Sequence, residues 1–287
     1  MTRRGARRGS RRAGLVSGAT AEGWLGRAVA LAEAGRGAEA RKAALRALRA
    51  EPGNAAARHV AGLLELRDGR AAKAVQHLRK AAAAEPGNPL YLTNLGLALI
   101  RAERGQEARA SLEKAARANP HFAPALYNLA LLEIEDGDAA RAEAGLRRAL
   151  ALEPGYAKAR YELGRLLHGQ GALEEALASF ERVLADDPQD PDAHYGAGLV
   201  EQELCRFRAA VGHYRAVLSH DPEQIDARLN LGFCLQEVGA LEAAIEVYRE
   251  ALQRDRALYP LVLKTMTTAA RGQYWLRPSE LRARLLG

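Results

Sequence analysis

Histidine and cysteine are the side chains of this sequence that most readily bind metal ions or transfer protons. The seven histidines are His59, His77, His121, His168, His194, His213 and His220, at scattered positions. Cys205 and Cys234 have no partner at CxxC spacing, and neither lies beside a closely spaced histidine pair. A metal centre or an acid–base pair needs such groups to be clustered, so we expect neither a metal site nor a catalytic site.

Sequence motifs of well-known catalytic chemistry are also missing. The chain contains no HExxH zinc-protease motif, no phosphate-binding P-loop, no GxSxG nucleophile turn and no GxGxxG loop after a strand. We therefore predict a protein that is not an enzyme and that uses no cofactor.

Cysteine content and hydropathy limit the expected compartment. Two separated cysteines do not make a disulfide framework, which favours a reducing compartment. No apolar run approaches the ~20 residues of a membrane-spanning helix. Arg11 and Arg12 resemble a twin-arginine export signal, but no apolar segment follows them. We therefore expect a cytoplasmic protein.

Proline recurs along most of the chain at a fixed interval. Pro52, Pro86, Pro120, Pro154, Pro188 and Pro222 follow one another at intervals of 34 residues. Alanine keeps the same interval at Ala40, Ala74, Ala108, Ala142, Ala176, Ala210 and Ala244. A fixed period of this length is typical of a helix–turn–helix repeat array. The recurring alanine predicts a position where two helices approach so closely that a larger side chain would overpack.

Two sets of glycines share this period. Gly35, Gly69, Gly137, Gly171 and Gly239 mark the point at which the first helix of a repeat must end and turn. Gly62, Gly96, Gly164, Gly198 and Gly232 fall inside the first helix. Because glycine costs a helix interior up to ~1 kcal/mol, its recurrence there predicts a close backbone contact with the second helix.

One repeat shows the whole pattern: Leu92-x2-Leu95-Gly96-x2-Leu99, then Ala108-x3-Leu112, then Pro120. This pattern resembles the tetratricopeptide repeat (TPR) family. The resemblance implies an all-α fold, a right-handed α-solenoid or superhelix of seven helix–turn–helix units with a C-terminal helical cap. The units would span residues 21–54, 55–88, 89–122, 123–156, 157–190, 191–224 and 225–258.

The two ends of the chain differ from the repeats in composition. Residues 1–20 contain six arginines, no acidic residue and almost nothing apolar, which predicts a disordered tail. Residues 259–287 are expected to form the cap, with helices from Pro260 to about Arg271 and from Glu280 to Leu286. The apolar residues expected to cover the last repeat are Tyr259, Leu261, Leu263, Met266, Tyr274, Trp275 and Leu276.

In TPR proteins, the first helices of the units line a concave surface along which a ligand segment lies. Carried over position by position, the resemblance implies a peptide-binding groove formed by Leu63, Asn94, Leu97, Ile100, Tyr127, Asn128, Leu131, Tyr161, Arg165, Tyr195 and Asn230. The three asparagines resemble the amide ladder with which some members of the family hold a peptide backbone. The tyrosines and leucines could instead pack between neighbouring first helices, and the sequence leaves both interpretations open.

The charge of the expected groove indicates the type of ligand. Asp192, Glu203, Asp226 and Glu237 make its C-terminal half acidic, which favours a ligand with apolar anchors and a basic end. The carboxylate-clamp subtype of the family uses lysine at the fifth position of its first unit, and no unit here has one. We therefore do not expect an acidic chaperone C-terminus as the ligand.

Together these features predict a non-catalytic scaffold or adaptor that binds a protein or peptide partner. One alternative is an accessory subunit that docks on nucleic acid or a ribosome through its basic ends. No aromatic residue interleaves the arginines of the tail to stack on bases, which disfavours this alternative. A second alternative is the recognition partner of a separately encoded enzyme.

Overall fold

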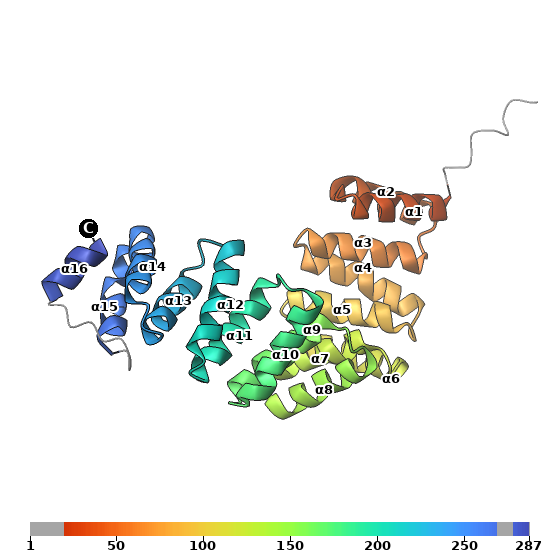
Figure 1. The fold of residues 1–287 in the computed structure, drawn as a ribbon. Coiled ribbons are helices and arrows are strands. Elements are labelled where there is room, and N and C mark those ends of the chain that lie inside the picture. The colour runs from red at the N-terminus through yellow and green to blue at the C-terminus, as the bar shows by residue number, and fades with distance from the viewer. Residues whose placement is uncertain (1–19, 269–277, 287) are drawn as a thin grey trace, which may run out of the picture. The chain divides into compact units, whose positions relative to one another are not determined.

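A computed structural model describes residues 20–268 and 278–286 of the chain. All regular elements in these residues are helices, and none is a strand (Figure 1). Seven pairs of helices follow one another along the chain, which confirms the all-α repeat fold expected from the 34-residue period. The expected disorder of residues 1–20 concerns a segment that, apart from Thr20, lies outside the described residues.

Contacts divide the chain into two compact units, residues 1–152 and 153–287, which we call unit 1 and unit 2. The pairs of unit 1 are α1 (Ala21–Glu33) with α2 (Gly37–Ala50), α3 (Ala55–Arg67) with α4 (Ala71–Ala84), α5 (Pro89–Arg101) with α6 (Gly105–Ala118), and α7 (Ala123–Glu135) with α8 (Ala139–Leu152). Those of unit 2 are α9 (Ala157–Gly169) with α10 (Leu173–Asp186), α11 (Pro191–Glu203) with α12 (Phe207–His220), and α13 (Ile225–Glu237) with α14 (Leu241–Arg254).

Small residues bring the two helices of a pair together. The recurring alanines, among them Ala74 and Ala142, are completely buried on the second helices. The glycine inside the first helix leaves room for a large side chain of the second helix, rather than for its backbone as expected. A Cβ atom on Gly62 would lie 2.5 Å from Cγ of Leu78, and one on Gly232 would lie 2.5 Å from Cε1 of Tyr248.

The turn between the helices of a pair needs a left-handed residue. Glycine fills this position in five pairs, with φ between +72° and +82°. Glu103 and Cys205 occupy it in the other two, both with φ of 57°. Glycine adopts this conformation without the steric cost that a Cβ atom imposes, which explains the periodic glycines predicted to end the first helix.

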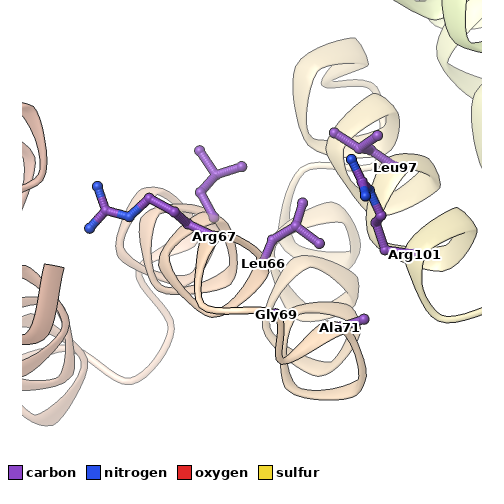
Figure 2. A pocket seen from close by; sticks show the side chains of 7 residues that line it. Leu66, Arg67, Gly69, Ala71, Leu97 and Arg101 are labelled. Atoms are coloured by element: carbon purple, nitrogen blue, oxygen red, sulfur yellow. The ribbon is translucent and has the colours of Figure 1, made fainter. Parts of the chain in front are cut away.

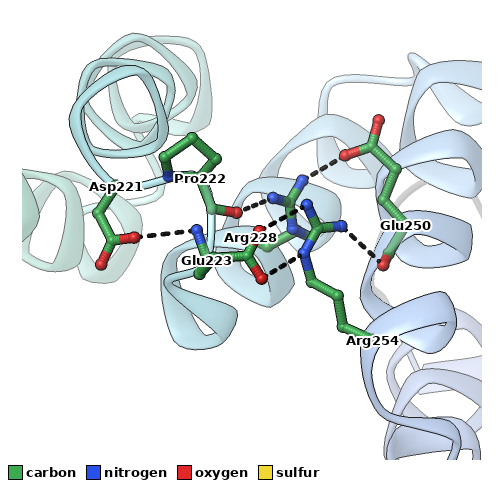
Figure 3. A network of polar contacts seen from close by, with 6 residues as sticks. All are labelled: Asp221, Pro222, Glu223, Arg228, Glu250 and Arg254. Carbon is green, nitrogen blue, oxygen red and sulfur yellow. Dashed lines mark hydrogen bonds and ion pairs between the residues drawn. The ribbon is translucent and has the colours of Figure 1, made fainter.

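In three first helices, an arginine at the fourth position bonds back to the proline turn that precedes its helix. Arg58 donates to the carbonyl of Pro52 at 3.0 Å, and Arg160 donates in the same way to that of Pro154. Arg228 does the same to Pro222 and also pairs with Glu250 of α14 (Figure 3). These bonds tie the proline turn, where one pair ends, to the first helix of the next pair.

A helical cap follows the seventh pair. It consists of a 3₁₀ turn (Arg256–Leu258), α15 (Tyr259–Thr268) and α16 (Pro278–Leu286). Val262 and Met266 of α15, and Leu281 and Leu285 of α16, are buried in the core of the seventh pair. Tyr259 and Leu263 pack against this core as expected.

Leu261 is 49% exposed, so its expected role in covering the last repeat is wrong. Its side chain lies on a different side of α15 from the buried side chains of Val262 and Met266. Arg271, where the first cap helix was expected to end, and Tyr274, Trp275 and Leu276 lie outside the described residues.

Candidate functional site

Unit 1 contains an open cleft of about 670 Å³ between α3 and α5 (Figure 2). It is lined by Leu63, Leu66, Arg67, Gly69, Ala71, Leu97 and Arg101. The three leucines are half-buried, so part of each apolar surface faces the cleft. This combination provides an apolar floor with basic residues at its edge.

The two arginines of this cleft are held differently. The guanidinium group of Arg67 points away from Leu66, and its Nη1 donates to the carbonyl of Ala32 at 3.2 Å (Figure 2). The side chain of Arg101 runs beside Leu97 on α5 (Figure 2). Both arginines are exposed, but Arg67 is tied to the end of α1 by this hydrogen bond.

Unit 2 contains a second open cleft, of about 520 Å³, formed by α11, α13 and α15. Its lining residues are Tyr195, Gln202, Asp226, Leu229, Asn230, Phe233, Leu261, Lys264 and Thr265. Helix α15 of the cap therefore forms one side of this cleft, as a further first helix would. The exposure of Leu261 has a structural explanation, because its side chain lines this cleft instead of covering the core.

A hydrogen bond holds one polar side chain of the second cleft. The hydroxyl of Tyr214 donates to Oε1 of Gln202 at 3.0 Å. Burial, with a contribution from the Asp226 carboxylate, raises the pKa of Tyr195 above its ordinary value. The phenol therefore stays protonated at neutral pH and can act as a hydrogen-bond donor.

The buried cysteine behind this cleft is chemically inert. Sγ of Cys234 lies 3.4 Å from Oε1 of Gln202. Burial raises the pKa of the Cys234 thiol to about 12, so the nucleophilic thiolate is scarcely populated at neutral pH. Cys234 thus serves as a small packing residue between α11 and α13.

The predicted groove residues of unit 1 have different surroundings. Leu63 and Leu97 line the first cleft. Nδ2 of Asn94 contacts Nε2 of His59 at 2.7 Å, which joins α5 to α3. Asn128 is only 8% exposed and donates to the carbonyl of Pro124 in its own helix at 2.7 Å. The remaining predicted residues, Ile100, Tyr127 and Leu131, are half-buried, and Ile100 packs against the core.

The predicted groove residues of unit 2 are partly engaged with neighbouring side chains. Tyr161 packs against Phe180 with ring centroids 5.7 Å apart, and Arg165 lies over the Tyr161 ring at 6.0 Å. Tyr195 meets Tyr214 edge-on at 6.1 Å while it lines the second cleft with Asn230. Packing between helices therefore accounts for part of each tyrosine surface. A ligand-binding role for these residues stays a prediction.

Residues at the edges of the clefts were missed by sequence reasoning. Arg67 and Arg101 occupy the thirteenth position of their repeats, which the resemblance also assigns to the concave surface, so this signal was available. Phe233 occupies the ninth position. Lys264 and Thr265 belong to the cap, and the repeat pattern contains no signal for them.

The described part of the chain contains neither a metal-binding cluster nor a membrane-spanning helix. No group of three or more histidine, cysteine or acidic residues in it could hold a metal ion. None of its helices is both long and apolar enough to cross a membrane.

Sequence models described as tetratricopeptide repeat match most of the chain. One matches residues 133–200 and 203–265, and another matches 11–55, 25–89 and 93–146. No curated protein matches the chain by sequence.

Solved structures with the same repeat fold include a chain of the APC/C hetero-tetramer Cut9–Hcn1, with 18% identity and a TM-score of 0.70. That match covers 77% of this chain but only 43% of the other, so this chain spans less than half of it. A thermophilic TPR protein of Thermus thermophilus is 28% identical, with a TM-score of 0.55 and coverage of 63% and 98%. YrrB, described as a TPR protein with an unusual peptide-binding site, is 24% identical, with a TM-score of 0.51 and coverage of 65% and 96%.

Proposed function

This chain belongs to the tetratricopeptide repeat family, and on that basis we propose that it is a non-catalytic scaffold or adaptor that binds a segment of a partner protein. Members of the family generally act as protein–protein interaction scaffolds. The proposal adds a binding surface, namely the inner edges of the first helices.

One observation carries the proposal: the clefts of unit 1 and unit 2 are both lined by residues of first helices. Leu63 and Leu97 contribute to one, and Tyr195 and Asn230 to the other. All four belong to the positions that the family resemblance assigns to the ligand. The peptide-binding site of YrrB gives further support, since that protein has the same fold.

The composition of the clefts suits an extended protein segment. Half-buried leucine and aromatic side chains offer apolar surface at a small entropic cost, and their neighbouring amides can bond a peptide backbone. Apolar anchors in such sites typically contribute about 1–4 kcal/mol each to binding. The two free cysteines suit a reducing compartment, so we also propose a cytoplasmic location.

The test is affinity capture by the immobilised full chain, with quantitative mass spectrometry of the retained proteins. Leu63→Asp places a charge in the first cleft. Leu45→Asp makes the same change on α2, where Leu45 is 39% exposed and lies outside both clefts. We expect the specific partners to be lost with Leu63→Asp and kept with Leu45→Asp. Thermal melts must show that both variants are folded, and loss of partners with Leu45→Asp alone would instead place binding on the second helices.

A further inference from the structure

Arg101 is an exposed cation at the edge of the unit 1 cleft. Within the described residues, its guanidinium group forms no hydrogen bond and no ion pair. Figure 2 shows its side chain alongside Leu97, so the charge lies next to the apolar floor. A cation beside an apolar surface suits a ligand that carries an anion next to an apolar group.

The acidic side chains on the neighbouring turn cannot serve as that anion, because they are already paired. Glu65 pairs with Arg70. Asp68 pairs with the same arginine and with Arg41, whose Nη1 lies 2.9 Å from Oδ2 of Asp68. Arg67 adds a second positive charge to the edge, with one hydrogen bond to a neutral carbonyl. The cleft therefore keeps a positive charge that its own turn does not neutralise.

The backbone N–H groups of the turn between α3 and α4 are already bonded to carbonyl groups. The N–H of Gly69 donates to the carbonyl of Leu66 at 3.0 Å, and that of Arg70 donates to Glu65 at 2.9 Å. Recognition of a chain terminus usually relies on several backbone N–H groups arranged as a nest. A single guanidinium fork instead suits one side-chain carboxylate, which it can bind through two parallel hydrogen bonds.

We propose that the unit 1 cleft binds an internal, acidic segment of a partner protein, in which an Asp or Glu lies close to a leucine-like residue. The carboxylate accepts hydrogen bonds from Arg101, and the aliphatic side chain rests on Leu63, Leu66 and Leu97. This inference rests on the proposed function and adds the chemistry of the partner. The sign of the ligand charge is opposite to that expected from the acidic residues of unit 2.

The experiment is a selection from a peptide library with degenerate positions, acetylated and amidated at its ends, on the full-length chain. Arg101→Gln removes the guanidinium group that would bind the partner's carboxylate. Arg49→Gln is the matched control, because it removes the same charge from an exposed arginine of α2 that does not line the cleft. We expect the wild type to enrich Asp or Glu near Leu, Ile or Met. Arg101→Gln should lose the acidic preference and keep the apolar one, and Arg49→Gln should keep both.

A titration of the most enriched peptide then measures the effect. We expect Arg101→Gln to weaken binding at least about tenfold, as is typical of a hydrogen-bonded charge pair, and Arg49→Gln to leave it unchanged. Acidic enrichment that survives Arg101→Gln, or apolar enrichment without acid in the wild type, would overturn the inference but leave the proposed function standing. Enrichment confined to a second library with free C-termini would overturn the choice of a side-chain carboxylate. A wild type that enriches no peptide would overturn both proposals.

Discussion

At the scale of single residues, volume decides how closely the helices of each pair can pack. Alanine is completely buried at the same position of every second helix, and glycine faces a large side chain in most first helices. Interiors packed to this density tolerate neither a missing nor an added methylene group without cost. Function depends on this packing indirectly, because it sets the spacing of the side chains that line each cleft.

Ala142→Leu tests this tight packing. Ala142 is completely buried on α8, so the larger side chain should overpack the pair and lower the free energy of unfolding by about 1–3 kcal/mol. Ala144→Leu is the matched control, because Ala144 is exposed on the same helix. Urea denaturation of both variants measures the difference. Equal midpoints for the two variants would show that this position has room for leucine.

The histidine pair of unit 2 predicts a dependence of stability on pH. Nδ1 of His194 lies 2.9 Å from Nδ1 of His213, so one ring must accept the hydrogen bond. Burial, and then the charge of His194, lower the pKa of His213 below 6.5. Protonation therefore favours the unfolded chain, and stability falls as the pH drops below about 6.5, by at most about 1.4 kcal/mol per pH unit for one group.

His213→Gln isolates this effect from the other histidines, among which His59 also has a pKa lowered by burial. The stability advantage of the wild type over His213→Gln should shrink between pH 7.5 and pH 5. His220→Gln, a change at an exposed histidine, is the control. An advantage that stays constant over this range would mean that His213 takes up a proton as readily in the folded chain as in the unfolded chain, so that folding does not lower its pKa.

The candidate site was harder to predict than the fold, because a repeat position does not reveal which partners a side chain has. Asn128 occupies an expected ladder position but donates to its own helix, and Asn94 instead contacts His59 of the neighbouring repeat. Arg101 has no partner among the described residues, although its position is equivalent to that of Arg67, which is anchored on Ala32. Such differences arise from the neighbouring repeat, whose side chains vary.

At the scale of helices, polar contacts connect successive pairs within each unit. The most buried of these is at Arg228, which is 5% exposed and contacts Pro222 and Glu250 (Figure 3). Arg254 of α14 reinforces the same junction through Glu223, at 3.1 Å. A buried guanidinium is costly unless a carboxylate and carbonyls surround it, so this junction depends on every partner.

Glu250→Ala should therefore lower the free energy of unfolding by about 1–2 kcal/mol, since Arg228 loses its only carboxylate partner among the described residues while Glu250 itself is partly exposed. The backbone carbonyl of residue 250, which accepts a hydrogen bond from Arg254, is retained in this variant. Glu246→Ala, one turn earlier, is the control, because among the described residues the exposed Glu246 pairs only with Arg249 of the same helix. If chemical denaturation shows that the two variants are equally stable, the buried pair has no structural role.

The helices themselves could be predicted from the sequence because their signals repeat. Proline ends each second helix from the first pair to the sixth, and glycine in the left-handed region ends most first helices, so one repeat explains the others. The cap has no such internal copy. Its expected apolar cover included Leu261, but this residue lines the second cleft. The two cap helices are too short for their apolar pattern to predict which side faces the core.

At the scale of the whole chain, a repeat array is stabilised mainly by contacts between neighbouring repeats, so its ends need special treatment. In unit 2 the last pair is covered by α16, where Leu281 and Leu285 are almost completely buried. Arg249 of α14 donates to the carbonyl of Arg284, and Arg284 pairs with Glu242 at 2.7 Å. The first pair starts differently: Thr20 caps α1 by accepting from the N–H of Gly23.

Deletions at the two ends should therefore have opposite outcomes. Removing residues 278–287 exposes the core around Ile245 and Leu252, and the loss of two buried leucines should destabilise the seventh pair by about 3 kcal/mol or more. Removing residues 1–19 keeps the Thr20 cap and deletes a segment with almost no apolar residues, so the melting temperature should not change.

Thermal melts compare the two truncated chains. Hydrogen exchange should show faster exchange in α13 to α15 for the C-terminal deletion alone, because opening of a repeat array begins at the end that has lost its cover. A drop of several degrees on removal of residues 1–19 would instead show that the arginine-rich segment packs on the repeats.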